Sequence, residues 1–143
     1  MGTGNKKTTN HITGFKEEID KASKGNLNTF FNWFDESGGD IDTNFIKGQC
    51  EFALYILMPL FKLLKNPKNK TALEIGYGGG RLLAAASNYF GKVIGIDIHN
   101  NIQIVKNEFK KRSITNYELL RNDGISIPIE GSSIDCVYSF IVL

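Results

Sequence analysis

The segment that most constrains the fold is an apolar run that ends in a cluster of glycines and leads into a second apolar run. Leu73-Glu74-Ile75 precedes Gly76-Tyr77-Gly78-Gly79-Gly80, and Val93-Ile94-Gly95-Ile96-Asp97 follows. This pattern predicts a buried strand, a glycine turn, a helix and a second strand that ends in a carboxylate. Glycines at alternate positions let a backbone turn sharply and approach a ligand with no Cβ in between.

The same segment predicts a ligand site. The helix that begins after Gly80 directs its free N–H groups at the turn. Asp97 stands about twenty residues beyond Gly76, at the end of the next strand, where a carboxylate accepts hydrogen bonds from a ribose. The sequence therefore predicts a nucleoside-containing cofactor that lies across the carboxyl ends of parallel strands.

Two details distinguish between cofactors. The dinucleotide fingerprint G-x-G-x-x-G fails in both registers, because Arg81 and Leu83 stand where its last glycine is needed. Glu74 lies in the apolar run before the turn, where it would repel a pyrophosphate and attract an ammonium or sulfonium group. At this point the chain resembles the class I S-adenosylmethionine-dependent methyltransferases. Their first motif is an acidic residue followed by G-x-G-x-G, which Glu74 and the three alternate glycines match.

The resemblance covers residues 72–143. Asn122-Asp123-Gly124 looks like the family's third strand end, where an acid and the next N–H meet the adenine, and residues 127–129 with 133–139 resemble its "LPF … SFDxV" passage. Asp97 matches the ribose acid, and Ile98 is expected on the adenine face. The resemblance implies S-adenosylmethionine as cofactor and this set of binding residues: Glu74, Gly76, Tyr77, Gly78, Gly80, Asp97, Ile98, Asn122, Asp123, Gly124 and Ser139.

Several of these residues also have structural readings. Asn122-Asp123-Gly124 is a good turn sequence, and Asp97 could cap the following helix. Glu74 could be an ordinary salt-bridged carboxylate, and serine is common at strand ends such as Ser139. We expect His99 at the surface. The sequence indicates neither a catalytic base nor a cluster of metal ligands.

Composition bounds the class of protein. A chain of 143 residues suffices for one domain, and its 41% hydrophobic content is typical of globular proteins. A net charge of +2 gives no argument for a nucleic-acid or membrane partner. Without a signal peptide or an apolar run long enough for a bilayer, we expect a cytoplasmic protein. Cys50 and Cys136 are expected to be reduced and packed.

The N-terminal half reads as helical. We expect a disordered tail over 1–13, an N-terminal helical segment over 14–66 and an S-adenosylmethionine-binding half-domain over 67–143. Short helices are expected over 15–23 and 28–34, and a longer one begins with Asp42 as its N-cap. Pro59 predicts a kink in that longer helix. One apolar stripe should face the core: Ile46, Cys50, Ala53, Leu57, Leu60 and Leu64.

Beyond residue 70 strands and helices alternate. The expected strands are 72–75, 92–97, 118–121 and 134–139, with helices at 81–89 and 102–112. Nearly continuous apolar strands that alternate with helices predict a doubly wound parallel α/β sheet that is covered on both faces, with its first three strands in the order 3-2-1. The resemblance implies that the fourth strand lies beside the first, which gives a Rossmann-like sheet in the order 3-2-1-4. The family has further strands after the fourth, so we expect a chain truncated there, with an open edge.

The expected function is S-adenosylmethionine-dependent methyl transfer to a small-molecule acceptor. The acceptor atom and the oligomeric state stay open. This stretch of chain alone is expected to be inactive, because the acceptor half of the family fold is missing. Two alternatives remain, a nucleotide- or NAD-binding oxidoreductase domain and a non-catalytic Rossmann-like module.

Overall fold

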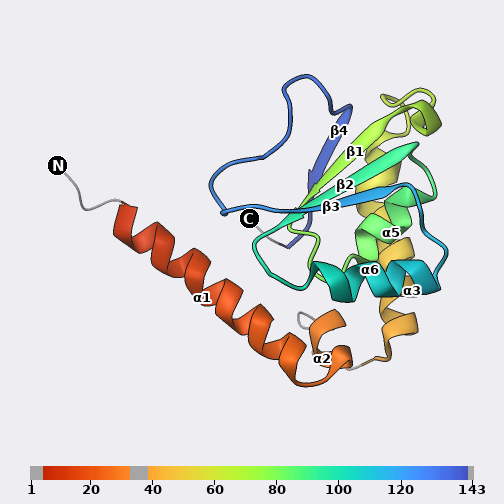
Figure 1. Cartoon of the computed structure of the whole chain (residues 1–143). Coiled ribbons are helices and arrows are strands. Elements are labelled where there is room, and N and C mark those ends of the chain that lie inside the picture. Colours follow the sequence, from red (N-terminus) through yellow and green to blue (C-terminus); the bar gives the residue numbers. More distant parts are fainter. Residues whose placement is uncertain (1–4, 33–38, 142–143) are drawn as a thin grey trace.

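The computed structural model describes residues 5–32 and 39–141, and of residues 5–13 only the backbone. Two helical regions precede the sheet, and strands alternate with helices after residue 70 (Figure 1). The elements in chain order are α1 (Asn5–Lys24), α2 (Leu27–Phe31), α3 (Ile41–Glu51), the π-helix η1 (Phe52–Leu57), α4 (Met58–Leu60), the 3₁₀ turn η2 (Pro67–Asn69), β1 (Thr71–Ile75), α5 (Arg81–Ser87), β2 (Lys92–Asp97), α6 (Ile102–Lys111), β3 (Tyr117–Arg121) and β4 (Cys136–Ser139).

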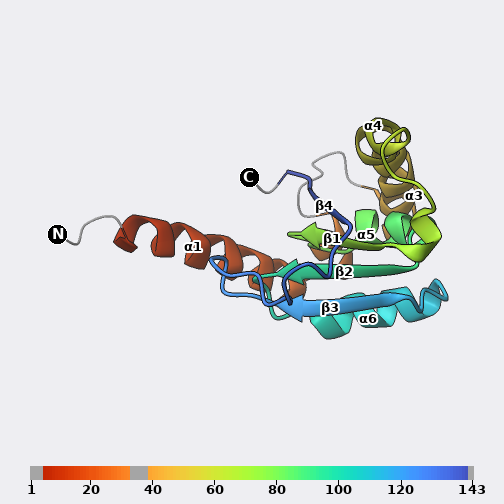
Figure 2. The ribbon, with the colours of Figure 1, turned by 90° about the horizontal axis from the view of Figure 1, so that it is seen from above.

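The four strands form one parallel sheet in the order β3-β2-β1-β4, which confirms the predicted topology. Glu74 of β1 lies in register with Gly95 of β2 and with Tyr138 of β4. The arrowheads of β1, β2 and β3 point to the same side of the molecule, toward which α1 projects (Figure 2). The carboxyl ends of the strands therefore meet at one edge, where the sequence predicts the site.

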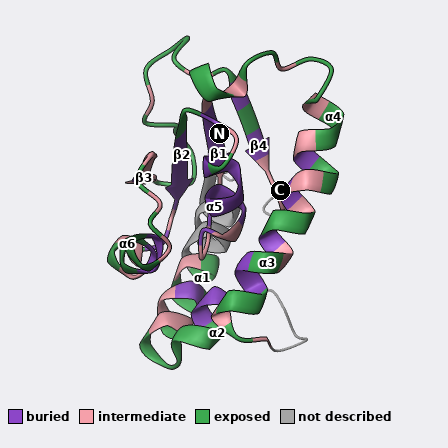
Figure 3. Cartoon of the chain, turned by 90° about the vertical axis from the view of Figure 1, so that its right-hand side faces the viewer, coloured by how far each residue is buried: buried purple, intermediate pink, exposed green. Residues whose placement is uncertain are grey.

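The described helices contribute to the core on one face of this sheet. Ala72, Val93 and Tyr138 belong to the same buried cluster as residues of α1, α2, α3, α5 and α6. All of Leu82–Ser87 in α5 is buried, as Figure 3 shows. The other face carries Leu73, Ile94 and Ile96, against which side chains of the 122–135 segment pack instead of a described helix. The prediction that helices cover both faces is therefore confirmed for one face, whereas no described helix packs on the other.

The start of the chain differs from the prediction. Residues 5–13, expected in a disordered tail, belong to the backbone of α1, and residues 1–4 lie outside the described residues. The physical reason is that no proline interrupts residues 5–24 and the helix tolerates Gly14, so it extends from its buried residue Ile19 toward the N-terminus. In α2, Phe30 and Phe31 are buried, whereas Trp33 and Phe34 of the expected aromatic helix lie outside the described residues.

The longer helix begins earlier than predicted and turns a different face to the core. Asp40, not Asp42, is the N-cap of α3, and its carboxylate accepts a hydrogen bond from the Thr43 N–H at 2.7 Å. Ile46 and Cys50 of the predicted stripe are exposed, because Gly48 allows α3 to approach α5 so closely that the neighbouring face is buried instead. The residues buried on that face are Phe45, Gly48, Phe52 and Ile56.

The expected distortion before Pro59 is a π-helix. Pro59 has no N–H to donate to the Tyr55 carbonyl, so an α-helical hydrogen bond is missing there. In η1 the backbone hydrogen bonds span five residues instead of four, which makes the helix wider. The Met58 N–H, for example, donates to the Ala53 carbonyl. Leu57, Leu60 and Leu64, also in the predicted stripe, pack at the margin of the core.

The contact between α3 and α5 predicts a cost for any side chain at Gly48. An added Cβ would lie 2.6 Å from the Arg81 carbonyl oxygen, which is backbone and cannot turn away. We expect Gly48→Ala to lower the free energy of unfolding by about 1–3 kcal/mol in chemical denaturation. The control is Gly14→Ala in α1, where a Cβ would meet nothing within 4 Å. This variant should gain about 0.5–1 kcal/mol from helix propensity, and equal effects at both positions would contradict the close packing.

Candidate functional site

The glycine turn between β1 and α5 needs its glycines for conformation. Gly76, Gly78 and Gly80 have φ angles of 77°, 50° and 83°, a region that side chains disfavour. The Gly76 N–H donates to the Ile96 carbonyl at 2.8 Å, and the Gly80 N–H donates to the Tyr77 carbonyl at 2.7 Å. At Gly78 an added Cβ would meet nothing within 4 Å, so this glycine borders open space.

Asp97 fixes the glycine turn from the neighbouring strand. Its Oδ2 accepts a hydrogen bond from the Gly78 N–H at 2.7 Å, and its Oδ1 accepts one from the Ile98 N–H at 2.7 Å. Only 7% of the residue is exposed. Oδ1 also accepts a longer hydrogen bond from the His99 N–H at 3.4 Å, whereas Oδ2 keeps a second lone pair, since a carboxylate oxygen can accept two hydrogen bonds. Asp97 therefore joins the two βα turns of the site and retains capacity for ligand hydroxyls.

His99 is the residue that the sequence reasoning missed. It was expected at the surface, but it is fully buried. Its Nε2 lies 2.9 Å from the Gly78 carbonyl oxygen, and its Nδ1 accepts a hydrogen bond from the Asn101 N–H at 3.0 Å. The only sequence signal was its position two residues after Asp97, because the rings that bury it come from distant segments.

Glu74 is a buried carboxyl group beneath the turn. Its Oε2 accepts a hydrogen bond from the Tyr138 hydroxyl at 3.1 Å. Burial, with a smaller contribution from the negative charge of Asp97, raises the pKa of Glu74 from 4.5 to about 8, although the Tyr138 hydrogen bond acts in the opposite direction. The ordinary salt-bridge reading fails within the described part of the chain, where no ion pair includes Glu74. A cation near Glu74 would therefore stabilise its charged form.

Tyr77, predicted as a cofactor-binding residue, points its side chain into the protein. The residue is 3% exposed, and its ring lies so close to Gly95 that an added Cβ there would be 2.8 Å from Tyr77 Cδ1. Burial raises the pKa of its hydroxyl, whose oxygen has no hydrogen-bond partner. Any contact of Tyr77 with a ligand at this edge of the sheet would therefore involve its backbone.

The ends of β3 and β4 bring the remaining predicted residues to the same edge. The Asn122 N–H donates to the Asp97 carbonyl at 2.9 Å, and the Ser139 hydroxyl donates to the Ile75 carbonyl at 3.0 Å. Asp123 is exposed and accepts hydrogen bonds from the N–H groups of Ile125 and Ser126. These bonds lower the pKa of Asp123 to about 2. Asp123 therefore forms the turn that the sequence also allowed, followed by Gly124 with φ of 79°.

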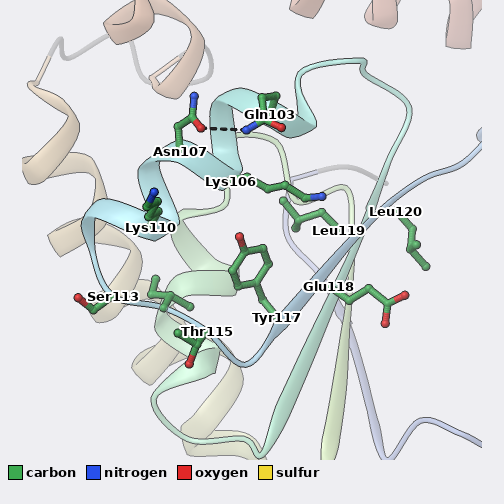
Figure 4. Close-up of a pocket in the computed structure, with 11 residues that line it drawn as sticks. Gln103, Lys106, Asn107, Lys110, Ser113, Thr115, Tyr117, Glu118, Leu119 and Leu120 are labelled. Carbon is green, nitrogen blue, oxygen red and sulfur yellow. Dashed lines mark hydrogen bonds between the residues drawn. The ribbon is translucent and has the colours of Figure 1, made fainter.

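A surface hollow lies elsewhere. It has a volume of about 840 Å³ and is bordered by α6 and β3, with Lys106, Lys110, Tyr117 and Glu118 among its lining residues (Figure 4). None of the predicted site residues lines it. The predicted site is instead the edge where the carboxyl ends of β1, β2, β3 and β4 meet. No described helix is long and apolar enough to span a membrane.

The fold and this edge have the form of a Rossmann-like nucleoside-binding domain with an acidic residue before its glycine turn. Residues 73–143 match the family model of a methyltransferase domain. This half of the chain belongs to the class I S-adenosylmethionine-dependent methyltransferases. No curated protein matches the chain.

Solved methyltransferase structures share the fold. A phosphoethanolamine N-methyltransferase from Haemonchus contortus superposes with a TM-score of 0.59 at 16% identity, over 92% of this chain and 25% of its own. An S-adenosylmethionine-dependent methyltransferase from Aquifex aeolicus gives 0.52 at 21% identity, over 68% of this chain and 55% of its own. A dimethyladenosine transferase from Plasmodium falciparum gives 0.50 at 29% identity, over 60% and 31%. The chain thus spans between about a quarter and about half of these proteins.

The residues at this edge fit the cofactor of the family. S-adenosylmethionine carries an ammonium and a sulfonium group, and the buried Glu74 has no cationic partner in the described part of the chain. The cofactor also carries ribose hydroxyls, for which Asp97 Oδ2 has a free lone pair. Asn122 Oδ1 is a buried acceptor without a partner near the same strand ends. These acceptor groups therefore suit a cationic, hydroxyl-bearing ligand.

The raised pKa of Glu74 predicts a pH-dependent stability. The unfolded state ionises near the ordinary value of 4.5 and the folded state only near 8, so the unfolded chain binds fewer protons between these values. Glu74 should therefore lower the free energy of unfolding as pH rises through this window, and no further above it. Glu74→Gln mimics the protonated group and removes this loss. Urea unfolding of both proteins from about pH 5 to about pH 8 should show a growing advantage of the variant, whereas a constant difference would contradict the shift.

Proposed function

We propose that the protein binds S-adenosylmethionine at the carboxyl ends of β1, β2, β3 and β4 and serves methyl transfer to a small-molecule acceptor. The observation that carries this proposal is the buried carboxyl group of Glu74, which has no cationic partner among the described residues and lies at the glycine turn held by Asp97. Because the chain spans only part of the related structures, the acceptor and the activity of the whole protein belong to the proposal. So do a cytoplasmic location and the division at residues 66 and 67.

The bound cofactor supplies a methyl group on a sulfonium, which leaves as a neutral thioether. The protein's task is then alignment and the exclusion of water. In our proposal Glu74 draws the cationic part of the ligand toward β1, and Asp97 accepts hydrogen bonds from the ribose. Ile98, half-buried beside Asp97, offers an apolar surface to the adenine. Asn122, Asp123 and Gly124 would border the base, and Ser139 would border the methyl-donor end. No described side chain is assigned as a general base.

An NAD-binding oxidoreductase domain is the alternative from a different class. Arg81 and Leu83 occupy the positions of the glycine that pyrophosphate binding requires. Leu83 is fully buried in the core, so it cannot make room for a pyrophosphate without repacking. The acidic residue before the turn would also repel that group. These features favour the methyltransferase cofactor.

The first test is calorimetry with S-adenosylhomocysteine and with NAD. We expect S-adenosylhomocysteine to bind more tightly, with release of protons from Glu74 near neutral pH, because its ammonium group lowers the pKa that burial raises to about 8. Proton release is measured from the dependence of the binding heat on the ionisation heat of the buffer. Glu74→Gln is the control and should bind without this release. Tighter binding of NAD would overturn the proposal.

The second test separates Asp97 from an ordinary carboxylate. Asp97→Ala should weaken S-adenosylhomocysteine binding roughly ten- to a hundredfold, since charge-assisted hydrogen bonds contribute about 1.5–3 kcal/mol each. Asp135→Ala is the matched control, because Asp135 bonds to Lys70 and to the Thr71 N–H at the opposite ends of the strands. Circular dichroism checks the fold of both variants. Equal affinities in the two variants would show that Asp97 has no role in binding.

A further inference from the structure

His99 lies between the glycine turn and the N-terminal helices. No part of it is exposed, and its ring contacts Tyr77 and Phe30 edge to face, with centroid distances of 5.0 and 5.6 Å. Phe30 belongs to α2, about seventy residues earlier in the chain. Burying an imidazole among aromatic rings is costly unless both nitrogens have hydrogen-bond partners. Both of them do.

These partners determine the protonation state of the ring. The Gly78 carbonyl can only accept, so Nε2, at 2.9 Å, must carry a hydrogen. The Asn101 N–H can only donate, so Nδ1, at 3.0 Å, must be without one. His99 is therefore neutral, in the Nε2–H tautomer. A proton on Nδ1 would face the Asn101 N–H and break that bond.

The two hydrogen bonds from the end of β2 fix consecutive peptide planes at the apex of the glycine turn. The Gly78 N–H, which belongs to the Tyr77–Gly78 peptide, donates to Asp97. The Gly78 carbonyl, which belongs to the Gly78–Gly79 peptide, accepts from His99. Because peptides here are trans, the Gly79 N–H points in the opposite direction to the carbonyl that His99 holds. His99 thus determines where this N–H is directed.

We propose that His99 is a positioning residue for cofactor binding, because its Nε2–H orients the Gly78–Gly79 peptide. This inference rests on the proposed function of the site, since it concerns the same glycine turn. Ordering a glycine-rich turn costs conformational entropy, and in this protein the turn is already ordered before a ligand binds. Cofactor affinity should therefore fall when the hydrogen bond from His99 is lost.

Charged and polar groups surround His99. Asp97 Oδ2 lies 3.8 Å from Nε2. The Tyr77 ring contacts His99, and burial raises the pKa of its hydroxyl. From α1, Asp20 accepts hydrogen bonds from Asn100 and Asn101, the residues that follow His99. From α2 the neighbour is the uncharged Phe30.

Two substitutions separate positioning from packing. His99→Phe keeps an aromatic ring but loses both hydrogen bonds, whereas His99→Gln offers an N–H₂ donor at the place of Nε2 but loses the ring. We expect the Phe variant to bind S-adenosylhomocysteine about tenfold more weakly than the wild type, and the Gln variant to bind within a few-fold of it. A packing role predicts the reverse order. A Phe variant that binds as tightly as the Gln variant, or more tightly, overturns the proposal.

The tautomer of the His99 ring is a second test. In ¹⁵N-labelled wild type at about pH 7.5, the imidazole should give the resonances of an Nε2–H tautomer, because the Gly78 carbonyl needs a donor and the Asn101 N–H needs an acceptor. An Nδ1–H ring overturns the proposal.

A readout without cofactor distinguishes the two proposals from each other. Hydrogen exchange of the Gly78 amide, which donates to Asp97, should be faster in the Phe variant and unchanged in the Gln variant. If the wild type binds no S-adenosylhomocysteine while the exchange pattern holds, the proposed function fails and the role of His99 in ordering the turn stands. If binding occurs but exchange is equal in all three proteins, the role of His99 fails alone.

Discussion

The hydrogen bond between the Asp97 carboxylate and the Gly78 N–H is the contact on which the candidate site depends. Three glycines with positive φ would make the turn after β1 the most mobile part of a free chain, and ordering it is costly in entropy. Asp97 offsets this cost from the end of the adjacent strand. Because parallel strands in register bring Ile75 and Ile96 side by side, the acid that ends β2 lies within reach of the turn that follows β1. The sheet topology thus produces the contact.

The site also contains two buried acidic side chains, Glu74 and Asp97, which the fold itself does not require. The negative charge of Asp97 adds to the effect of burial that raises the pKa of Glu74. An apolar residue at position 74 would pack against Ala72 and Tyr138 at no electrostatic cost. A buried acid in a central strand is therefore a local violation of the rules that stabilise a sheet, and such violations are expected at functional sites. A cationic ligand converts this destabilisation into binding energy.

The parts of the molecule that could be predicted depend on short-range patterns. Strand β2 was predicted at its observed bounds, because Lys92–Asp97 is apolar between a charged start and an acidic end. The order of β3, β2 and β1 followed from the handedness of βαβ units, and the place of β4 beside β1 followed from the family resemblance. The buried position of His99 could not be predicted, because Phe30 and Tyr77 bury it and Phe30 is remote in sequence. The prediction of the buried face of α3 was wrong for a related reason. Gly48 packs on Arg81, which is remote in sequence, and this contact places Phe45 and Phe52 in the core.

The N-terminal helices are part of the support of the glycine turn. Gly79 allows Phe31 to pack directly on the turn, because an added Cβ would lie 2.9 Å from Phe31 Cδ1. Phe30 covers His99, and Asp20 of α1 accepts hydrogen bonds from the loop after β2. The end of β2 and the loop after it, which hold Gly78 through Asp97 and His99, are therefore in contact with both α1 and α2. The predicted boundary at residue 66 separates a helical segment from a cofactor-binding segment by their sequence patterns. These contacts nevertheless make both segments part of the support of the site. A change in the packing of α2 would alter the turn both directly, where Phe31 packs on Gly79, and through the contact of Phe30 with His99.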